Sequence, residues 1–505
     1  MDSSPVTALV PPTRIRTVGD ASMRPDGQYV LYWMTAYRRG QANFSLQRAV
    51  EWCRELNKPL LILEGLQSDY PWASDRLHRF VIQGMVDNAR HFSGHTVTYY
   101  PYVESEPGAG RGLLRTLVSS ACVVVGDDFP CFFLPRMVSA VAARTPVRME
   151  LVDSNGLLPM RTAPKVFSRA FDFRRFLQRE LLPHLAERPQ TDPLANIALP
   201  TTTVRADILQ RWPAVVLDDA DQDTRWLSKL PIDHQVHSVP SQGGSVEANR
   251  RLESFVTQKL TRYGDDRNQP DKPATSGLSA YLHFGHLSAH TIFDRVTREV
   301  AWSPDQVSPK VTGSQTGWWG AAASVEGFLD QLTTWRELGF NMCWQRTDFD
   351  QFDSLPDWAI QTLETHTEDP RDFSYDLEQF EQAATHDPLW NAAQRELVRD
   401  GHMHNYLRML WGKKILEWTE SPRVALDVMI HLNNKYALDG RNPNSYSGIF
   451  WVLGRYDRAW GPERPIFGKI RYMSSANTAR KLKLKQYLAK YGPLQQQSLL
   501  DPAPR

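Results

Sequence analysis

The feature that most constrains the fold is a change of pattern between the two halves of the chain. From residue 29 to about residue 159, short β-rich runs such as "YVLYWM" (29–34) and "CVVVGDD" (122–128) alternate with helical stretches such as "SLQRAVEWCRELN" (45–57). This alternation predicts a parallel sheet covered by helices on both faces. From "GGSVEANRRLESFVTQKLTRY" (243–263) onward the helical period dominates. We therefore predict a Rossmann-like α/β N-terminal domain and an all-α C-terminal domain.

The length of the chain also requires more than one domain, because 505 residues exceed what a single hydrophobic core holds. Residues 186–245 are rich in Pro, Asp and Thr, which indicates a long connection with short elements of its own. The predicted division is an arm at 1–26, an α/β domain at 27–160, a linker at 161–245, a helical domain at 246–492 and a tail at 493–505.

Several kinds of site are excluded by the sequence. The four cysteines, Cys53, Cys122, Cys131 and Cys343, have no CxxC spacing, so we expect neither a disulfide framework nor a zinc knuckle. Free cysteines fit a reducing cytoplasm. No apolar run has membrane-spanning length, so no membrane partner is expected. The α/β half has no GxGxxG or Walker sequence, so a dinucleotide or phosphate site is not supported there.

Charge is balanced over the whole chain but not along it. The net charge is +1, whereas residues 346–400 hold 4 Lys and Arg against 14 Asp and Glu, and residues 401–490 hold 16 against 6. A basic block of this kind can mark a face that binds nucleic acid. Alternatively, the acidic and basic blocks pair with each other in the folded protein, and the sequence leaves both readings open.

"GHMHNYLRMLWGKKILEW" (401–418) predicts a helix with Trp411 and Trp418 on one side, because residues seven apart lie two turns apart on one face. Core packing alone would explain such a stripe.

"TSGLSAYLHFGHLS" (275–288) places hydroxyls and a glycine before a helix, which suits a phosphate but also an ordinary N-cap. His283, His286 and His290 have the spacing of one helical face, but no Asp, Glu or Cys joins them, so we expect no metal.

Four segments together carry a resemblance. "THDPLWNAAQ" (385–394), "MHNYLRMLWGKKILEW", "LNNKYALDGRNPNSYSGI" and "ERPIFGKIRYMS" resemble, in order and spacing, the class II DNA photolyases of the photolyase/cryptochrome family. The resemblance runs from about residue 27 to residue 490. It implies a carbon–carbon lyase that splits cyclobutane pyrimidine dimers in DNA with blue light, using reduced FAD bound in the helical domain.

The resemblance also assigns the residues that hold FAD. It implies that Arg408 and Asp439 form an ion pair beside the flavin and that Asn433 faces flavin N5. The implied cofactor-binding residues are Tyr263, Thr275, Ser276, Gly277, Leu278, Ser279, Asn405, Arg408, Asp439 and Arg441.

The tryptophans receive a redox role by the same resemblance. Trp411 is expected near the flavin and passes an electron to it, Trp390 is the outer partner that relays to the surface, and Trp418 assists. Core packing then becomes the lesser reading for Trp411, whereas for Trp418 packing and electron transfer stay equally open.

On the DNA side, Trp335 and Trp451 match two aromatics that pack against the flipped dimer. Photolyases are among the enzymes known to flip their target bases out of the duplex. The implied substrate or DNA contacts are Gln331, Trp335, Met409, Trp451, Arg455, Arg464, Lys469 and Arg471. One departure is Gln331 in "FLDQLTTW" (328–335), where the family has a glutamate. A glutamine amide donates to a carbonyl but holds no charge.

Two functions remain. The first is a repair enzyme, and the second is a cryptochrome-like photoreceptor without repair activity. Cryptochromes often carry long C-terminal extensions, whereas about thirteen residues follow Gly492, which favours the enzyme, while Gln331 favours the receptor. A deazaflavin-type antenna chromophore is expected in the N-terminal domain without assigned ligands, and the chain is expected to act as a monomer.

Overall fold

The computed structural model describes residues 9–217 and 224–493, so the ends of the expected arm and tail and part of the linker lie outside the described residues. Its sheet has six strands in the order β1-β6-β5-β2-β3-β4. These are β1 (Ile15–Val18), β2 (Tyr29–Met34), β3 (Leu60–Leu66), β4 (Thr98–Val103), β5 (Ala121–Asp127) and β6 (Met149–Val152). Every strand pair is parallel except β1 with β6, which confirms the predicted α/β fold with one antiparallel edge strand added.

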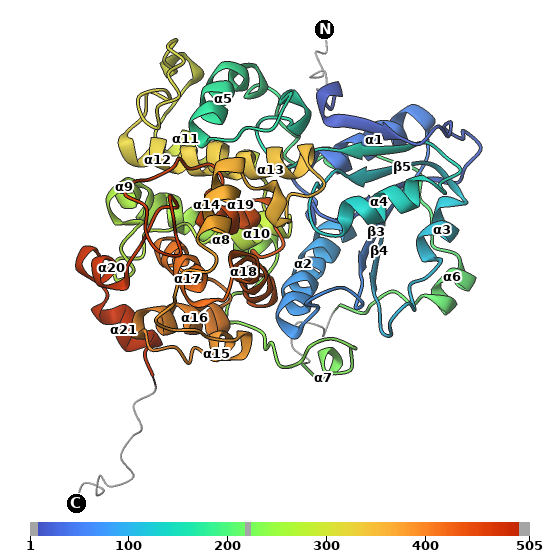
Figure 1. Ribbon diagram of the computed structural model, residues 1–505. Helices are drawn as coiled ribbons and strands as arrows, with labels where there is room; N and C mark the ends of the chain where they lie inside the picture. Colours follow the sequence, from blue (N-terminus) through green and yellow to red (C-terminus); the bar gives the residue numbers. More distant parts are fainter. Residues whose placement is uncertain (1–8, 218–223, 494–505) are drawn as a thin grey trace, which may run out of the picture.

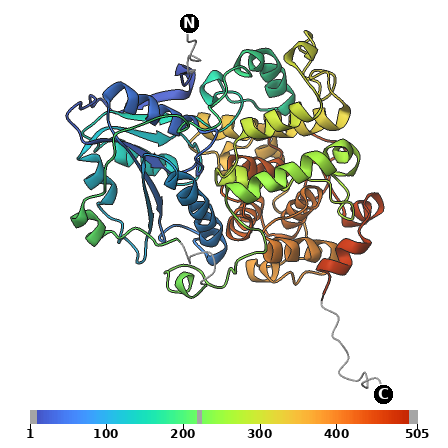
Figure 2. The same ribbon diagram turned by 180° about the vertical axis from the view of Figure 1, so that it is seen from behind.

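Helices cover both faces of this sheet, as Figure 1 shows on the right and Figure 2 from behind. They are α1 (Phe44–Leu56), α2 (Asp75–Ser93), α3 (Leu113–Val118) and α4 (Leu134–Ala142). Alternate residues of a strand point to opposite faces. Accordingly Val30 and Tyr32 of β2 pack in one core and Leu31 and Trp33 in another. This two-sided burial explains why β2 reads as a continuous apolar run.

The connection contains more structure than its composition indicates. It includes α5 (Ala170–His184), α6 (Ala206–Arg211) and α7 (Thr224–Leu227). The helix α5 lies beside α12 at the top of Figure 1. It is tied to the helical half by Arg174, whose Nε donates to Asp330 Oδ1 at 2.6 Å. Both side chains are buried, so α5 belongs to the packed helical half.

The helical half has the elements that the sequence pattern predicts, and it lies on the left of Figure 1. Its helices are α8 (Ser245–Gln258), α9 (Tyr263–Asp266), α10 (Ser279–His283), α11 (Ala289–Glu299), α12 (Ala323–Asp330), α13 (Arg336–Gln345), α14 (Asp357–Thr365), α15 (Leu377–Glu381), α16 (Pro388–Asp400), α17 (Asn405–Trp418), α18 (Pro422–Tyr436), α19 (Pro443–Val452), α20 (Ser475–Lys481) and α21 (Lys485–Tyr491). A π-helical turn, Gln331–Trp335, joins α12 to α13.

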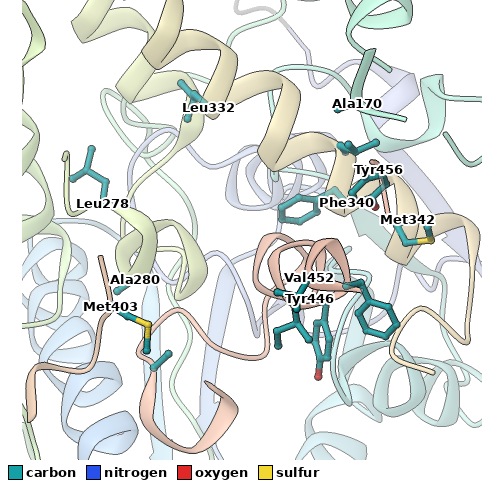
Figure 3. Packing of buried hydrophobic residues seen from close by; sticks show 14 of the residues in the cluster. Ala170, Leu278, Ala280, Leu332, Phe340, Met342, Met403, Tyr446, Val452 and Tyr456 are labelled. Atoms are coloured by element: carbon teal, nitrogen blue, oxygen red, sulfur yellow. The ribbon is translucent and has the colours of Figure 1, made fainter. Parts of the chain in front are cut away.

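Close packing of α13 against α19 forms the centre of this half. A Cβ on Gly339 would lie 2.6 Å from the carbonyl oxygen of Pro443, so only glycine allows the two helices to approach this closely. Figure 3 shows Phe340 of α13 near Tyr446 and Val452 of α19 in the shared core.

The seam between the halves consists of buried hydrogen bonds. Arg39 Nη1 donates to the Gly285 carbonyl at 2.9 Å, and Arg336 Nη1 donates to the Asn155 carbonyl at 2.7 Å. The carboxylate of Glu337 accepts from the Leu157 N–H at 2.7 Å. A buried charge must be fully bonded to be tolerated, so these contacts specify how the two halves dock.

The expected single face of His283, His286 and His290 is wrong. The helix α10 ends at His283 and α11 begins at Ala289, so a turn separates the first histidine from the last. His283 Nδ1 pairs with the Asn442 amide at 3.1 Å, and His286 Nδ1 accepts from the Gly244 N–H at 2.9 Å. Within the described parts of the chain, no helix is both long and apolar enough to cross a membrane.

Candidate functional site

Two stacked tryptophans lie at the contact of α16 and α17. Trp411 is 2% exposed and Trp390 is 0% exposed, and their rings lie 6.5 Å apart with an angle of 5°. Trp390 Nε1 donates to the Trp411 carbonyl at 3.0 Å, and Trp411 Nε1 donates to Gln394 Oε1 at 2.9 Å. Both indole N–H groups are therefore satisfied, and the pair is fixed in orientation.

A line of aromatic rings continues from this pair toward solvent. The rings of Trp390 and Trp418 are 6.0 Å apart, and those of Trp418 and His386 are 5.0 Å apart. Phe373 stacks on His386 at 3.7 Å and is 46% exposed. Trp390 is fully buried and does not itself reach the surface, and the row of rings continues from it through Trp418 and His386.

The ion pair expected beside the flavin is formed. Arg408 Nη2 donates to Asp439 Oδ1 at 3.2 Å. Burial by itself would raise the pKa of Asp439, but the charge of Arg408 and a hydrogen bond from Ser279 outweigh it and lower that pKa below 3.8. The carboxylate therefore stays ionised at neutral pH. Asp439 thus brings α10 and α17 together, although Ser279 and Arg408 are far apart in the sequence.

Asn433 lies nearby at the end of α18 and is 2% exposed. Its Nδ2 donates to Ser445 Oγ at 2.6 Å, which fixes the orientation of the amide. The buried guanidinium of Arg441 donates to the carbonyls of Asn434, Ala437 and Leu438. Arg441 therefore holds the turn after α18, at a residue with a positive φ of 57°, and its role toward a cofactor stays a prediction.

The expected phosphate segment is open to solvent. Thr275, Gly277 and Ser279 are exposed, Ser276 is half-buried, Leu278 is buried, and Tyr263 is 8% exposed beneath them. Gly277 has a φ of +67°, and a Cβ there would lie 3.7 Å from Arg251 Nη1. Sequence reasoning missed Arg251, because a cation on the exposed side of a helix gives no signal until the fold brings it beside this loop.

The residues expected to face a flipped base are half-buried. Gln331 and Trp335 share the π-helical turn, and such turns occur frequently at functional sites. Among the described residues the Gln331 amide has no hydrogen-bond partner. Met409 and Trp451 are half-buried as well, and Asn405 is exposed at the start of α17.

Lys413 lies beside Trp451 and was not assigned any role from the sequence. Its side chain is 0% exposed, its Nζ donates to the Val452 carbonyl at 2.5 Å, and Nζ lies 5.1 Å from the centroid of the Trp451 ring. Burial lowers the pKa of Lys413 to about 7, against a smaller raising effect of Asp457. In the sequence, only the apolar residues next to Lys413 along the helix indicated that its side chain is buried.

The expected cationic contacts with DNA divide into two kinds. Arg464 and Lys469 are exposed, and half-buried Arg471 bonds Asp457 at 3.1 Å. Arg455 is a correction: it is 1% exposed, donates to the Phe349 carbonyl at 3.0 Å and lies 3.7 Å from the centroid of Phe450. It therefore supports the loop from inside and does not face DNA.

The pairing of the acidic and basic blocks is confirmed in part, whereas the nucleic-acid face stays a prediction. Arg423 pairs with Asp353 at 2.9 Å and Lys435 with Glu381 at 2.7 Å, so acidic and basic segments do meet. Lys481, Lys483 and Lys485 are exposed and, within the described residues, have no ion-pair partner. A free basic strip therefore remains at α20 and α21.

A cavity of about 1030 Å³ lies where the carboxyl ends of the parallel strands meet the helical half. Trp33, Leu63 and Tyr102 line it from β2, β3 and β4, while His283 and Arg441 line it from the helical side. The exposed side chains of Arg111, Arg115 and Arg144 also line it and have no ion-pair partner within the described residues. Ligands of open α/β sheets bind at this edge.

Comparison with known proteins adds the following. No family model matches the sequence. The chain is 33% identical over 478 residues to the deoxyribodipyrimidine photo-lyase of Methanothermobacter thermautotrophicus, covering 94% of this chain and 97% of that protein. It is 32% identical over 493 residues to the enzyme of the same name from Arabidopsis thaliana, covering 96% and 93%. A class III photolyase structure from Agrobacterium tumefaciens has the same fold, with a TM-score of 0.66 at 17% identity over 97% and 88% of the two chains.

Proposed function

Because the chain belongs to the deoxyribodipyrimidine photo-lyase family of DNA-repair lyases, we propose that it splits cyclobutane pyrimidine dimers in DNA by light-driven electron transfer. The observation that carries this proposal is the placement of Arg408 and Trp411 three residues apart on α17. Residues at this spacing are neighbours on one helix face. The half-buried ion pair and the stacked tryptophan pair therefore belong to a single site.

The donor set of this site fits FAD. The hydroxyls of Thr275, Ser276 and Ser279, together with Arg251, suit a diphosphate. The Arg408–Asp439 pair and the fixed amide of Asn433 suit the polar edge of a flat heterocycle. Bound FAD supplies the photochemistry, because it absorbs blue light and donates an electron to the lesion. The protein holds the cofactor, excludes water and positions the base.

We assign the stacked pair and Trp418 to electron delivery within the protein. The rings lie 6.0–6.5 Å apart and continue through His386 toward solvent, so no large gap interrupts the route. The hydrogen bond that Trp411 Nε1 donates to Gln394 Oε1 holds the inner indole in place. These residues move electrons between the surface and the flavin site.

For the substrate, Trp335 and Trp451 would stack on the flipped bases, with Met409 beside them and Gln331 donating to a base carbonyl. Aromatic stacking with a cationic rim is how extruded bases are usually held. The rim would consist of Arg464, Lys469 and Arg471 with the strip at α20 and α21. The proposed division is an α/β domain at 27–160 and a helical domain at 246–492, acting as a monomer.

We also place a deazaflavin-type antenna in the cavity at the strand ends. Its walls are aromatic and apolar, which suits a flat heterocycle, and its volume of about 1030 Å³ is at the upper end for small-molecule sites. Arg111, Arg115 and Arg144 would meet an anionic or hydroxylated tail.

A photoreceptor without repair activity is the second candidate, and Gln331 is the observation that favours it. Light-dependent repair of an oligonucleotide containing one dimer decides between the two. We expect repair in blue light, none in the dark, and one flavin released per chain on denaturation. Asp439→Asn should lose flavin, whereas Asp427→Asn, an exposed residue of α18, should not. Bound flavin without repair by the wild type would support the receptor.

A further inference from the structure

A group of histidine and aspartate side chains lies at the end of α2 and shares no residue with the proposed flavin site. His91 is in the last turn of α2, His95 follows the helix, and Asp192 comes from the connection. His91 Nε2 lies 3.9 Å from Asp192 Oδ1, and His95 Nε2 lies 3.6 Å from Asp192 Oδ2. The three ligand atoms lie within 4.8 Å of one another, and among the described residues no other group of His, Cys, Asp and Glu does so.

The positions of these residues are fixed by the surrounding backbone. Asp192 Oδ1 accepts from the Leu194 N–H at 2.9 Å, and the Thr191 carbonyl accepts from the Ala42 N–H at 3.0 Å. His91 packs directly on Gly40, where a Cβ would lie 2.1 Å from the ring. The three side chains are half-buried, between 21% and 22% exposed. The site is therefore a built pocket and not a chance meeting of surface side chains.

One polar atom in this pocket has no partner. His91 Nε2 is buried and makes no hydrogen bond among the described residues. Leaving such a group unpaired is unfavourable, so buried polar atoms without partners call for an explanation. A metal ion would use the lone pair of this nitrogen, and most histidines are neutral at pH 7 and offer one.

We propose that His91, His95 and Asp192 bind a divalent transition-metal ion of the zinc type. Bonds of about 2.0–2.2 Å to nitrogen and oxygen place tetrahedral ligand atoms roughly 3.3–3.6 Å apart. The two distances to Asp192 are close to this value, so small rotations of the side chains complete the site. Water or a fourth ligand fills the open position. The ion joins the connection, through Asp192, to the end of α2 in the α/β half. It takes no part in repair.

The test is a zinc titration of the chelator-treated full-length protein by calorimetry, with cobalt as a spectroscopic probe. We expect one ion per chain and visible absorption of tetrahedral cobalt. His95→Ala and Asp192→Asn should each weaken zinc binding by more than about tenfold, because losing even an outer-shell partner costs 10–100-fold. His234→Gln, which removes a histidine paired with Asp75 at 2.8 Å, should leave zinc binding unchanged.

A second measurement separates the metal site from a plain ion pair. If zinc binds, it should raise the melting temperature of the wild type and of His234→Gln but not of Asp192→Asn. No heat of binding in the wild type, or equal zinc affinity in all four proteins, would overturn the proposal. A lower melting temperature of Asp192→Asn that is independent of zinc would show an ion pair only.

Discussion

At the scale of single residues, Gln331 is the side chain that we propose donates to a base carbonyl of the lesion. Its half-buried amide lies in a π-helical turn without a hydrogen-bond partner among the described residues, so it is free to donate to a base carbonyl. A neutral donor stabilises developing negative charge less well than a charged or protonated one, because charge-assisted hydrogen bonds are roughly twice as strong.

We therefore predict that Gln331→Leu lowers repair per absorbed photon while leaving the flavin spectrum intact. Gln331→Glu should equal or exceed the wild type, since it restores the glutamate that the resemblance implies at this position. The measurement is quantum yield on one dimer substrate at saturating binding. Equal yields in the three proteins would show that residue 331 does not touch the lesion.

We predict that buried Lys413 makes the stability of the protein depend on pH. Burial lowers its pKa from 10.5 to about 7 in the folded protein. Between these values the unfolded chain binds more protons at this lysine than the folded chain does, so the folded state gains stability as pH rises from about 7 toward 10. The contribution is absent below pH 7, where both states are protonated.

The variant that tests this is Lys413→Met, which keeps the length of the side chain. The free energy of unfolding of the wild type, relative to this variant, should increase from pH 7 to pH 9.5. Chemical denaturation at three pH values measures it, with Lys414→Met as the control, because Lys414 pairs with Glu417 at 2.5 Å. A constant difference would mean that Lys413 is charged throughout.

At the scale of elements, the contact of α16 with α17 holds the stacked tryptophans to which we assign electron delivery. Trp411→Phe should retain FAD but lose rapid photoreduction, and Trp390→Phe should give a charge-separated state that recombines quickly. Transient absorption with an external thiol measures both. Trp212→Phe is the matched control, since this buried tryptophan donates to Ala109 at 2.9 Å in the α/β half. Photoreduction at the wild-type rate in both relay variants would refute the assignment.

The strip at α20 and α21 alternates lysines with the buried Leu482 and Leu484. Changing Lys481, Lys483 and Lys485 to Gln should weaken binding to damaged and undamaged DNA alike. It should also reduce the log–log salt slope by roughly 2 to 3, since each phosphate contact contributes about 0.9. The control changes the exposed Lys165, Lys229 and Lys310. An unchanged slope would show that the strip only solvates its helices.

The elements themselves could be predicted where the hydrophobic period is strong, as in β2 and α17. Arg455 could not be placed, because only the fold shows that an arginine in a cationic segment turns inward to bond Phe349. The same holds for Arg251, which reaches the 275–279 loop through tertiary contact. The His283–His290 spacing misled because a turn at Gly285, with a φ of +73°, interrupts the helix.

At the scale of the whole molecule, Gly285 fixes how the halves dock. A Cβ there would lie 2.0 Å from the Ala36 carbonyl oxygen, whereas a Cβ on Gly317, with a φ of +80°, would meet nothing within 4 Å. Gly285→Ala and Gly317→Ala share the cost of a left-handed backbone, about 1–2 kcal/mol. Only Gly285→Ala adds a clash across the seam, about 1–3 kcal/mol or more.

We thus expect Gly285→Ala to lower the free energy of unfolding by more than Gly317→Ala and to open the seam to proteolysis. Denaturant unfolding and limited proteolysis of both variants measure this. Equal loss in the two variants would mean that the backbone strain dominates and that the seam tolerates displacement.

The hydrogen bonds of the seam join residues that are synthesised at different times. The carbonyl of Asn155 can accept its hydrogen bond only after Arg336, 181 residues later in the chain, has been synthesised. At a translation rate of about 5–20 residues per second, that delay is roughly 10–35 seconds. During this interval the Asn155 carbonyl and the Leu157 N–H of the 155–158 loop lack the partners that Arg336 and Glu337 supply in the folded protein, whereas Arg14 of the α/β half already donates to the carbonyls of Gly156 and Leu157. A chaperone that covers this loop, or a pause in translation that lengthens the interval, would therefore act on the docking of the two halves.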